Sequence, residues 1–328
     1  MTSRRDFDKS TTSEEVVAAF SHQIAGTTIL ITGVSPNGLG AAMAMALASE
    51  HPARLIFIAR QIAKADEVAH AIKTKVKDPP SMISLEMDLS SFESVRSAAE
   101  RLVDQDITIN TLVNNAGVMA LPNRTLSVDG HEMHFATNFL GHWLFTNSIS
   151  SIIAQGGRIV NVTSGGYMIC PIRFHDIDWE GVEALPQEEQ PDFVAAKSLG
   201  IGSLTSPGDY NGMLAYLHSN AASMLFSVGL TTRLKRQGVS TLSAAPGVII
   251  TELQRHIGGF RNATMEYKIA TQGAASLLVA ALDPALQSRS GAYINDCQLT
   301  EIISSHVQDE QVANRLWAVA NKMTNCNF

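Results

Sequence analysis

The chain has 328 residues, 45% of them hydrophobic and 17% charged, which suits one large globular domain or two small ones with an ample core. Its formal net charge of −7 argues against nucleic acid as a partner, because phosphate binding requires clustered Lys and Arg. The three cysteines lie far apart without metal-ligand spacing, so we expect no metal site and reduced thiols in a cytoplasmic protein. We expect neither a signal peptide nor a membrane span, because no apolar core follows the first charges and no apolar run reaches ~18–20 residues.

Short apolar or β-branched runs alternate with helical patterns along the chain. The sequence predicts strands at 27–32, 54–59, 83–87, 107–113, 158–162, 239–245 and 292–295. It predicts helices at 38–49, 62–75, 91–103, 130–153, 213–236 and 265–281. This regular alternation indicates an α/β fold with a single doubly wound domain, in which about seven parallel strands have helices on both faces.

Two stretches stand apart from that alternation. We interpret residues 1–25 as an N-terminal extension, with a short helix near 13–20, and residues 26–328 as the main domain. Segment 165–212 is rich in Gly, Pro and acidic residues, and we interpret it as an insertion, because loops of this length are usually functional or mobile. Its acidic residues are also explained as ordinary solvated surface.

A glycine-rich turn joins the first strand to the first long helix. Ile29–Gly33 runs directly into Val34–Gly40, and an Ala-rich helix follows. Glycines allow a tight turn and a close approach to a pyrophosphate, which the N–H groups of the helix N-terminus bind. The pattern therefore predicts a dinucleotide site, although a plain glycine turn is the simpler alternative.

Arg60 follows the second strand, at the position that meets the adenosine ribose in dinucleotide folds. An acid there would accept the 2′-hydroxyl of NAD, whereas Arg suits the 2′-phosphate of NADP. We therefore expect NADP(H) rather than NAD(H). The alternative is an Arg that faces solvent at the start of the next helix.

Several motifs together resemble the short-chain dehydrogenase/reductase family, closest to its retinol dehydrogenase and WW-domain oxidoreductase branch, over roughly residues 25–300. They are the glycine motif that starts at Thr32 and Gly33, with one residue more than the family pattern, and Asn114–Gly117, Phe135–His142, Asn161–Ser164, Tyr216–Asn220 and Pro246–Glu252. The resemblance implies a Rossmann fold. It also implies a cofactor site of Gly33, Ser35, Asn37, Gly38, Leu39, Gly40, Arg60, Asp88, Leu89, Asn114, Ala116, Gly117, Asn220, Pro246, Gly247, Val248 and Thr251.

The resemblance also implies roles at the reaction centre. Ser164 would hydrogen-bond the substrate carbonyl, Tyr216 would donate or accept the proton, and Asn138 would hold a water of a proton relay. Asp88 would lie beside the adenine ring. The alternatives are a purely structural amide at Asn138 and a simple strand-end hydroxyl at Ser164.

Asn220 occupies the place where the family carries its catalytic lysine. Residues 216 and 220 share one helix face, and a cation ~4 Å from the phenol is worth about 4 kcal/mol at an effective dielectric near ~20. Asn supplies no charge, so we expect the pKa of Tyr216 to stay near its ordinary ~10. Carbonyl reduction, which needs the neutral phenol, should then suffer less than alcohol oxidation. Lys197 in the insertion is an alternative source of charge.

The substrate prediction depends on a second lid, segment 252–267, whose apolar residues are Leu253, Ile257, Phe260 and Met265. Together with the insertion it suggests a bulky apolar molecule, such as a polyketide, terpenoid or steroid-like compound of secondary metabolism, although ordinary lid packing explains these residues equally well.

We therefore expect an NADPH-dependent reductase of a ketone, aldehyde or activated alkene. The alternatives are a non-redox isomerase, dehydratase or cyclase, and an NADP(H)-binding protein without turnover. The resemblance also suggests a homodimer or homotetramer, with residues 139–145 and 225–230 as candidate contacts.

Overall fold

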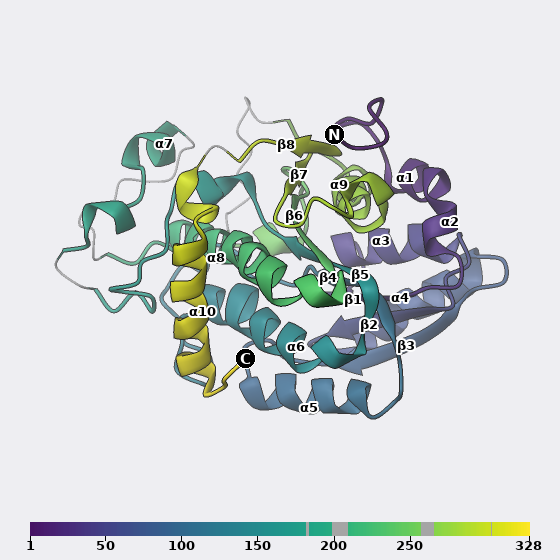
Figure 1. Ribbon diagram of the computed structural model, residues 1–328, viewed down its shortest axis with the longest axis horizontal. Coiled ribbons are helices and arrows are strands. Elements are labelled where there is room, and N and C mark those ends of the chain that lie inside the picture. Colours follow the sequence, from purple (N-terminus) through teal and green to yellow (C-terminus); the bar gives the residue numbers. More distant parts are fainter. Residues whose placement is uncertain (182–183, 199–208, 257–265, 303) are drawn as a thin grey trace.

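A single eight-stranded sheet forms the centre of the computed structural model, which describes all residues except 182–183, 199–208, 257–265 and 303 (Figure 1). The strands are β1 Thr28–Thr32, β2 Arg54–Ala59, β3 Ser81–Glu86, β4 Ile109–Asn114, β5 Ile153–Val162, β6 Ser240–Ala245, β7 Tyr293–Asn295 and β8 Gln298–Thr300. Their order is β3-β2-β1-β4-β5-β6-β7-β8, and β1 to β7 are parallel. The doubly wound α/β fold is thus confirmed, and the antiparallel β8 is one strand beyond the prediction.

Helices cover both faces of the sheet (Figure 1). Within the described ranges the α-helices are α1 Ser13–Ala19, α2 Ser21–Ile24, α3 Leu39–Ala48, α4 Ile62–Lys75, α5 Phe92–Val103, α6 Gly141–Ser148, α7 Phe193–Ser198, α8 Gly212–Arg233, α9 Ala270–Leu282 and α10 Glu310–Thr324. Successive side chains of a strand point to opposite faces, so Leu30 of β1 packs in the cluster of α5, α6, α8 and α10. Its neighbours Ile29 and Ile31 pack in the cluster of α1, α3, α4 and α9.

The N-terminal stretch packs against the domain. The short helix expected near 13–20 is α1, which begins with a capping box of Thr12 and Glu15 and contacts α3 and α9. Farther upstream, Arg4 O and Phe7 O both accept hydrogen bonds from the side chain of Gln298 in β8. The first residues therefore lie against the edge of the sheet, where β8 would otherwise be uncovered.

The single helix predicted over 130–153 is wrong. A π-helical turn, Phe135–Leu140, leads into α6, a 3-10 turn follows at Ser150–Ile152, and β5 already begins at Ile153. Apolar periodicity is nearly the same for a π turn and an α-helix, so sequence spacing does not separate them. The predicted helix 265–281 is also too long, since α9 begins at Ala270, and the prediction missed α10 altogether.

The surfaces suggested for oligomer contacts are buried within the protein, so that part of the prediction is wrong. Phe139, Phe145 and Phe226 are at most 2% exposed. α10 crosses and contacts α8 (Figure 1), and the Trp317 ring packs 6.0 Å from that of Phe226 and 5.3 Å from that of Trp143, centroid to centroid. A homodimer or homotetramer would therefore need another surface.

Candidate active site

The glycine-rich turn after β1 has the close contacts that glycine alone permits. A Cβ on Gly33 would lie 2.7 Å from Ala116 Cα, and one on Gly40 would lie 2.6 Å from Gly33 O. Gly33 also has a positive φ of 74°. The additional residue of this motif does not open the loop: Gly38 N donates to Ser35 O at 3.1 Å, and Asn37 takes a left-handed φ of 61°.

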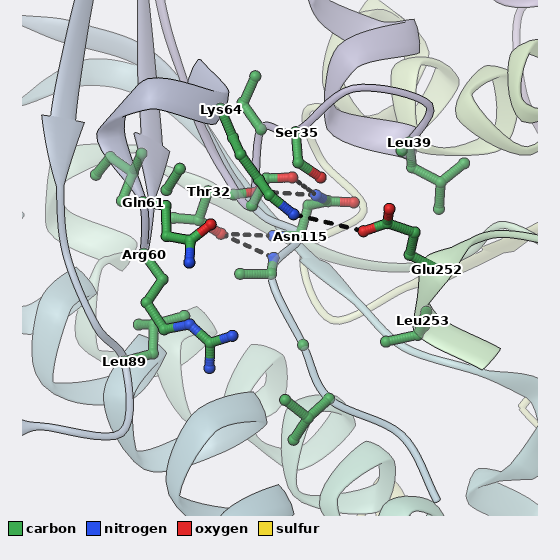
Figure 2. A pocket seen from close by; sticks show the side chains of 18 of the residues that line it. Thr32, Ser35, Leu39, Arg60, Gln61, Lys64, Leu89, Asn115, Glu252 and Leu253 are labelled. Carbon is green, nitrogen blue, oxygen red and sulfur yellow. Dashed lines mark hydrogen bonds and ion pairs between the residues drawn. The ribbon is translucent and has the colours of Figure 1, made fainter. Parts of the chain in front are cut away.

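A cavity of about 240 Å³ lies at the carboxyl ends of β1, β2, β3 and β4, where ligands bind in open α/β sheets (Figure 2). Its lining includes these predicted cofactor residues: Gly33, Ser35, Asn37, Gly38, Leu39, Arg60, Asp88, Leu89, Ala116, Gly117 and Thr251. The N-terminus of α3 also lies at the cavity, and its N-cap residue, Gly38, has no side chain that could cap the first N–H groups of the helix. Backbone donors, glycine contacts and a cation at the ribose position fit a dinucleotide.

Six predicted cofactor residues do not line this cavity: Gly40, Asn114, Asn220, Pro246, Gly247 and Val248. Asn114 is turned into the sheet, where its amide donates to Thr146 Oγ1 at 3.0 Å and to Asn161 Oδ1 at 2.8 Å. It therefore braces β4 against β5. The side chain of Lys268 packs over Gly247, with its Cδ 3.1 Å from the place of a Cβ.

Sequence reasoning missed several pocket residues, of which three are charged. Lys64 in the first turn of α4 lies 3.6 Å from Glu252, measured from Nζ to Oε2, and Figure 2 shows the two side chains pointing toward each other. Arg255 also lines the cavity and donates to Glu252 O at 3.0 Å. A lysine so early in a helix opposes the helix dipole, and that was the available signal for Lys64.

Tyr216 of α8 and Ser164, which follows β5, come together as the resemblance implied, although neither lines the cavity. Burial raises the pKa of the Tyr216 phenol, and hydrogen bonding to the side chains of Asn220 and Ser164 offsets only part of this rise. No cation in the described part of the chain contributes to the shift. Lys197 is exposed on α7 and has no effect on this pKa, so the alternative of a replacement charge from the insertion has no support.

Asn220 points back along its own helix. Its Nδ2 donates to the main-chain carbonyl of Tyr216 at 2.9 Å, and the residue is 5% exposed. Thr163 Oγ1 in turn donates to Asn220 O at 3.1 Å. The amide is therefore engaged with the helix, and it does not reach the described cavity.

Asn138 lies in the π-helical turn, and protein atoms engage both ends of its side chain. Oδ1 accepts from Val118 N at 2.8 Å, while Nδ2 donates to Val118 O at 3.0 Å and to Ser219 Oγ at 2.9 Å. Its main-chain carbonyl accepts from His142 Nδ1 at 3.1 Å and from Ser223 Oγ at 3.4 Å. These bonds favour the structural alternative for Asn138 over the water-holding one.

A buried histidine, which sequence reasoning missed, connects Asn138 to the cavity. His142 Nε2 lies 2.9 Å from the hydroxyl of Thr32, a cavity residue, and this hydroxyl accepts from the main-chain N–H groups of Asn115 and Ala116. Burial lowers the pKa of His142 to about 4, so its ring is neutral at physiological pH. With Nδ1 as the donor to Asn138, Nε2 is left to accept from Thr32.

Segment 165–212, predicted to be an insertion, has a small core of its own against α8 where it is described. Trp179 and Cys170 pack with Leu214 and Leu217, which flank Tyr216. The prediction of a solvated acidic surface is wrong in part: Glu189 is 3% exposed and pairs with His175, and Asp178 pairs with His131. Of the predicted lid 252–267, Leu253 lines the cavity, and Ile257, Phe260 and Met265 lie outside the described residues.

Comparison with known proteins identifies the family. The family model of the short chain dehydrogenases matches residues 27–169. Human retinol dehydrogenase 11 is 32% identical over 304 residues, which cover 91% of this chain and 86% of the relative. The chain belongs to the short-chain dehydrogenase family. This short-chain dehydrogenase is thus an oxidoreductase of a family that binds nicotinamide cofactors, close to the retinol dehydrogenase branch.

Other relatives agree with that assignment. Oxidoreductase fscI of Fusarium equiseti is 37% identical over 247 residues, covering 74% of this short-chain dehydrogenase and 94% of the relative. A crystal structure of a Mycobacterium paratuberculosis protein superposes with a TM-score of 0.62 at 25% identity, covering 93% and 95% of the two chains. A short-chain dehydrogenase from Burkholderia cenocepacia, solved in complex with NADP, has the same fold at a TM-score of 0.59 and 22% identity, covering 83% and 96%.

The described residues contain no helix long and apolar enough to cross a bilayer. They also contain no group of three or more His, Cys, Asp or Glu side chains arranged to hold a metal ion.

Proposed function

We propose that this short-chain dehydrogenase is an NADPH-dependent reductase of a ketone, aldehyde or activated alkene in a bulky apolar molecule. The observation that carries the proposal is the Tyr216 phenol, which is buried beside Ser164 and lies outside the influence of any described cation. A phenol whose pKa is raised stays protonated at neutral pH. It can therefore act as an acid but seldom as a base.

The choice of NADP(H) is supported by the charges on the cavity. Arg60 and Lys64 both line it. No carboxylate directly follows β2, where one would accept a hydrogen bond from the ribose 2′-hydroxyl of NAD(H). Asp88 also lines the cavity, but its Oδ1 accepts from the N–H and the hydroxyl of Ser90 at 2.9 and 2.7 Å. Two cations beside the ribose position favour a 2′-phosphate.

In the proposed reaction the bound cofactor supplies a hydride to the substrate. Ser164 holds the substrate carbonyl by donating a hydrogen bond to its oxygen, and Tyr216 donates its phenolic proton to the same oxygen as negative charge develops there. For an activated alkene, the proton goes to carbon after hydride addition. The reverse oxidation would start from tyrosinate, which burial without a cation makes scarce.

An apolar substrate is supported by the apolar surroundings of the site and by the names of the relatives. Leu253 in the predicted lid contributes an apolar surface to the cavity, and Tyr216 is packed against the apolar core of the insertion. Several relatives are named for retinol, an apolar alcohol. A secondary metabolite of similar character is our proposed substrate, and a cytoplasmic location remains part of the proposal.

A non-redox isomerase, dehydratase or cyclase is the second candidate, and one specific observation favours it. The side-chain amide of Asn138, implied for the proton relay, and that of Asn220, at the position of the family lysine, are both engaged by protein atoms. Proton exchange with solvent along that route is therefore hindered, while Ser164 and Tyr216 remain available for acid chemistry on a bound substrate.

One assay separates the candidates. The protein is incubated with NADPH and a panel of apolar ketones, aldehydes and enones, and both nicotinamide absorbance and products are followed, with Tyr216→Phe as the matched control. The proposal predicts NADPH consumption that the control loses. Product without NADPH consumption would establish the non-redox candidate instead. Tight NADPH binding without any product would indicate an NADP(H)-binding protein that does not turn over.

A further inference from the structure

Two cations from one short stretch of chain lie on the nucleotide cavity. Arg60 directly follows β2, and Lys64 lies in the first turn of α4 (Figure 2). A cation in the first turn of a helix is unfavourable, because it faces the positive end of the helix dipole. That turn contains no acidic residue, and Gln61 at the N-cap makes no side-chain capping bond. A charge that opposes the helix dipole and lies at a cavity, as that of Lys64 does, is typical of a binding residue.

The two cations differ in their partners. Lys64 pairs with Glu252 at 3.6 Å, and the two side chains are 45% and 71% exposed. The side chain of Arg60 makes no hydrogen bond or ion pair with any other residue that the structure describes. An ion pair as exposed as Lys64–Glu252 contributes little free energy on its own. It can therefore exchange its carboxylate for another anion at small cost.

We propose that Glu252 is an internal counter-ion, which holds Lys64 until a 2′-phosphate displaces it and Lys64 joins Arg60 as a second phosphate-binding cation. The inference rests on the proposed NADP(H) dependence. A phosphate monoester carries close to two negative charges and three acceptor oxygens, so it competes well with one carboxylate. A free ribose hydroxyl carries no charge, and with NAD(H) the lysine keeps Glu252.

The exchange makes Glu252 a determinant of cofactor choice. While it is present, Glu252 competes with the incoming phosphate for Lys64, so it lowers the affinity for 2′-phosphorylated nucleotides. Asp88, the other carboxylate on the cavity, does not take this role, because it is bonded to Ser90. Removing the charge of Glu252 should therefore strengthen the preference for NADP(H).

Calorimetric binding of adenosine 2′,5′-bisphosphate and of 5′-AMP, which differ only in the 2′-phosphate, tests the exchange without any substrate. At low salt, Glu252→Gln should bind the bisphosphate about two- to fivefold more tightly, with 5′-AMP unchanged. Lys64→Gln should bind the bisphosphate roughly tenfold more weakly. In the Lys64→Gln background, Glu252→Gln should have no further effect.

The matched control is Glu180→Gln, which removes the same charge from an exposed ion pair with Arg124, away from the cavity. It should leave both affinities unchanged, and an equal gain there would overturn the proposal by assigning the effect to net charge. An unchanged affinity in Glu252→Gln, or the same gain with and without Lys64, would also overturn it. A wild-type protein that binds the bisphosphate no better than 5′-AMP would instead refute NADP(H) dependence itself, and the exchange with it.

Discussion

The side-chain amide of Asn220 donates to the main-chain carbonyl of Tyr216, one helical turn earlier, at 2.9 Å. The amide carries no charge, and no cation among the described residues contributes to the pKa of the phenol, which burial raises. The acid form of Tyr216 therefore dominates at neutral pH, and the proposed direction of catalysis follows from it.

Restoring a cation at this position should favour oxidation. In Asn220→Lys, an ammonium within ~4 Å of the phenol would lower the pKa of Tyr216 by up to roughly three units. We expect alcohol oxidation near pH 7 to rise by at least about tenfold, with a smaller change in reduction. The pH profiles of both directions measure this, with Asn220→Gln as the uncharged control. Equal gains in both variants would show that charge is not the cause.

The Thr32 hydroxyl should be important for both stability and nucleotide binding. Thr32→Val leaves the N–H groups of Asn115 and Ala116 and the Nε2 of His142 without their partner, and should cost roughly 2–3 kcal/mol of unfolding free energy. It should also weaken NADPH binding, because Ala116 lines the cavity. Urea unfolding and calorimetry measure the two effects.

Thr111→Val is the control for that variant. Thr111 is also a buried strand residue, but its hydroxyl makes no hydrogen bond with the described residues. It should change the free energy of unfolding by less than about 0.5 kcal/mol. Similar losses in the two variants would mean that the hydrogen bonds of Thr32 have no special importance.

The helix α10 should be an integral part of the fold. Trp317 packs against Trp143 and Phe226, with the guanidinium of Arg233 3.8 Å from its ring centroid, and is 3% exposed. We expect Trp317→Ala to cost about 3–5 kcal/mol of unfolding free energy, because it leaves a cavity between α8 and α10. Denaturant unfolding measures the loss. A loss below about 1 kcal/mol would mean that α10 is only loosely attached.

The interaction between His131 and Asp178 should stabilise the protein only within a limited pH range. The hydrogen bond that His131 Nδ1 donates to the Asp178 carboxylate raises the pKa of His131, so its stabilising contribution is present below the ordinary His value and is lost as pH rises through the raised pKa. Burial opposes ionisation of Asp178, but hydrogen bonds from His131 and the Glu132 backbone outweigh it and lower the pKa of Asp178. That contribution is present above the ordinary Asp value and is lost as pH falls through the lowered one.

Asp178→Asn should therefore destabilise the protein more at pH 6 than at pH 9, by about 1 kcal/mol. Thermal unfolding of the variant and the wild type across this range measures the difference. A pH-independent difference would show that the charge of His131 does not contribute.

Sequence patterns predicted the sheet and many of the residues that line the cavity, because both depend on local chemistry. The contacts of Gly33 and Gly40 require glycine whatever surrounds them, and Arg60 is placed by the end of β2. Asn114 and Asn138 were harder to predict, because partners distant in sequence decide which way an amide points. Lys64 and Glu252 are 188 positions apart, and only the folded chain brings them together.

The ionisation of Tyr216 itself is the most direct test of the account. Ultraviolet difference spectra between the wild type and Tyr216→Phe, each saturated with NADP⁺ and titrated from pH 6 to 11, would isolate the tyrosinate signal of this residue. We predict that tyrosinate forms only above the pH range in which an ordinary tyrosine ionises, because burial raises the pKa of this phenol. A tyrosinate signal that appears near neutral pH would contradict the account, because the phenol would then be as ready to accept a proton as to donate one.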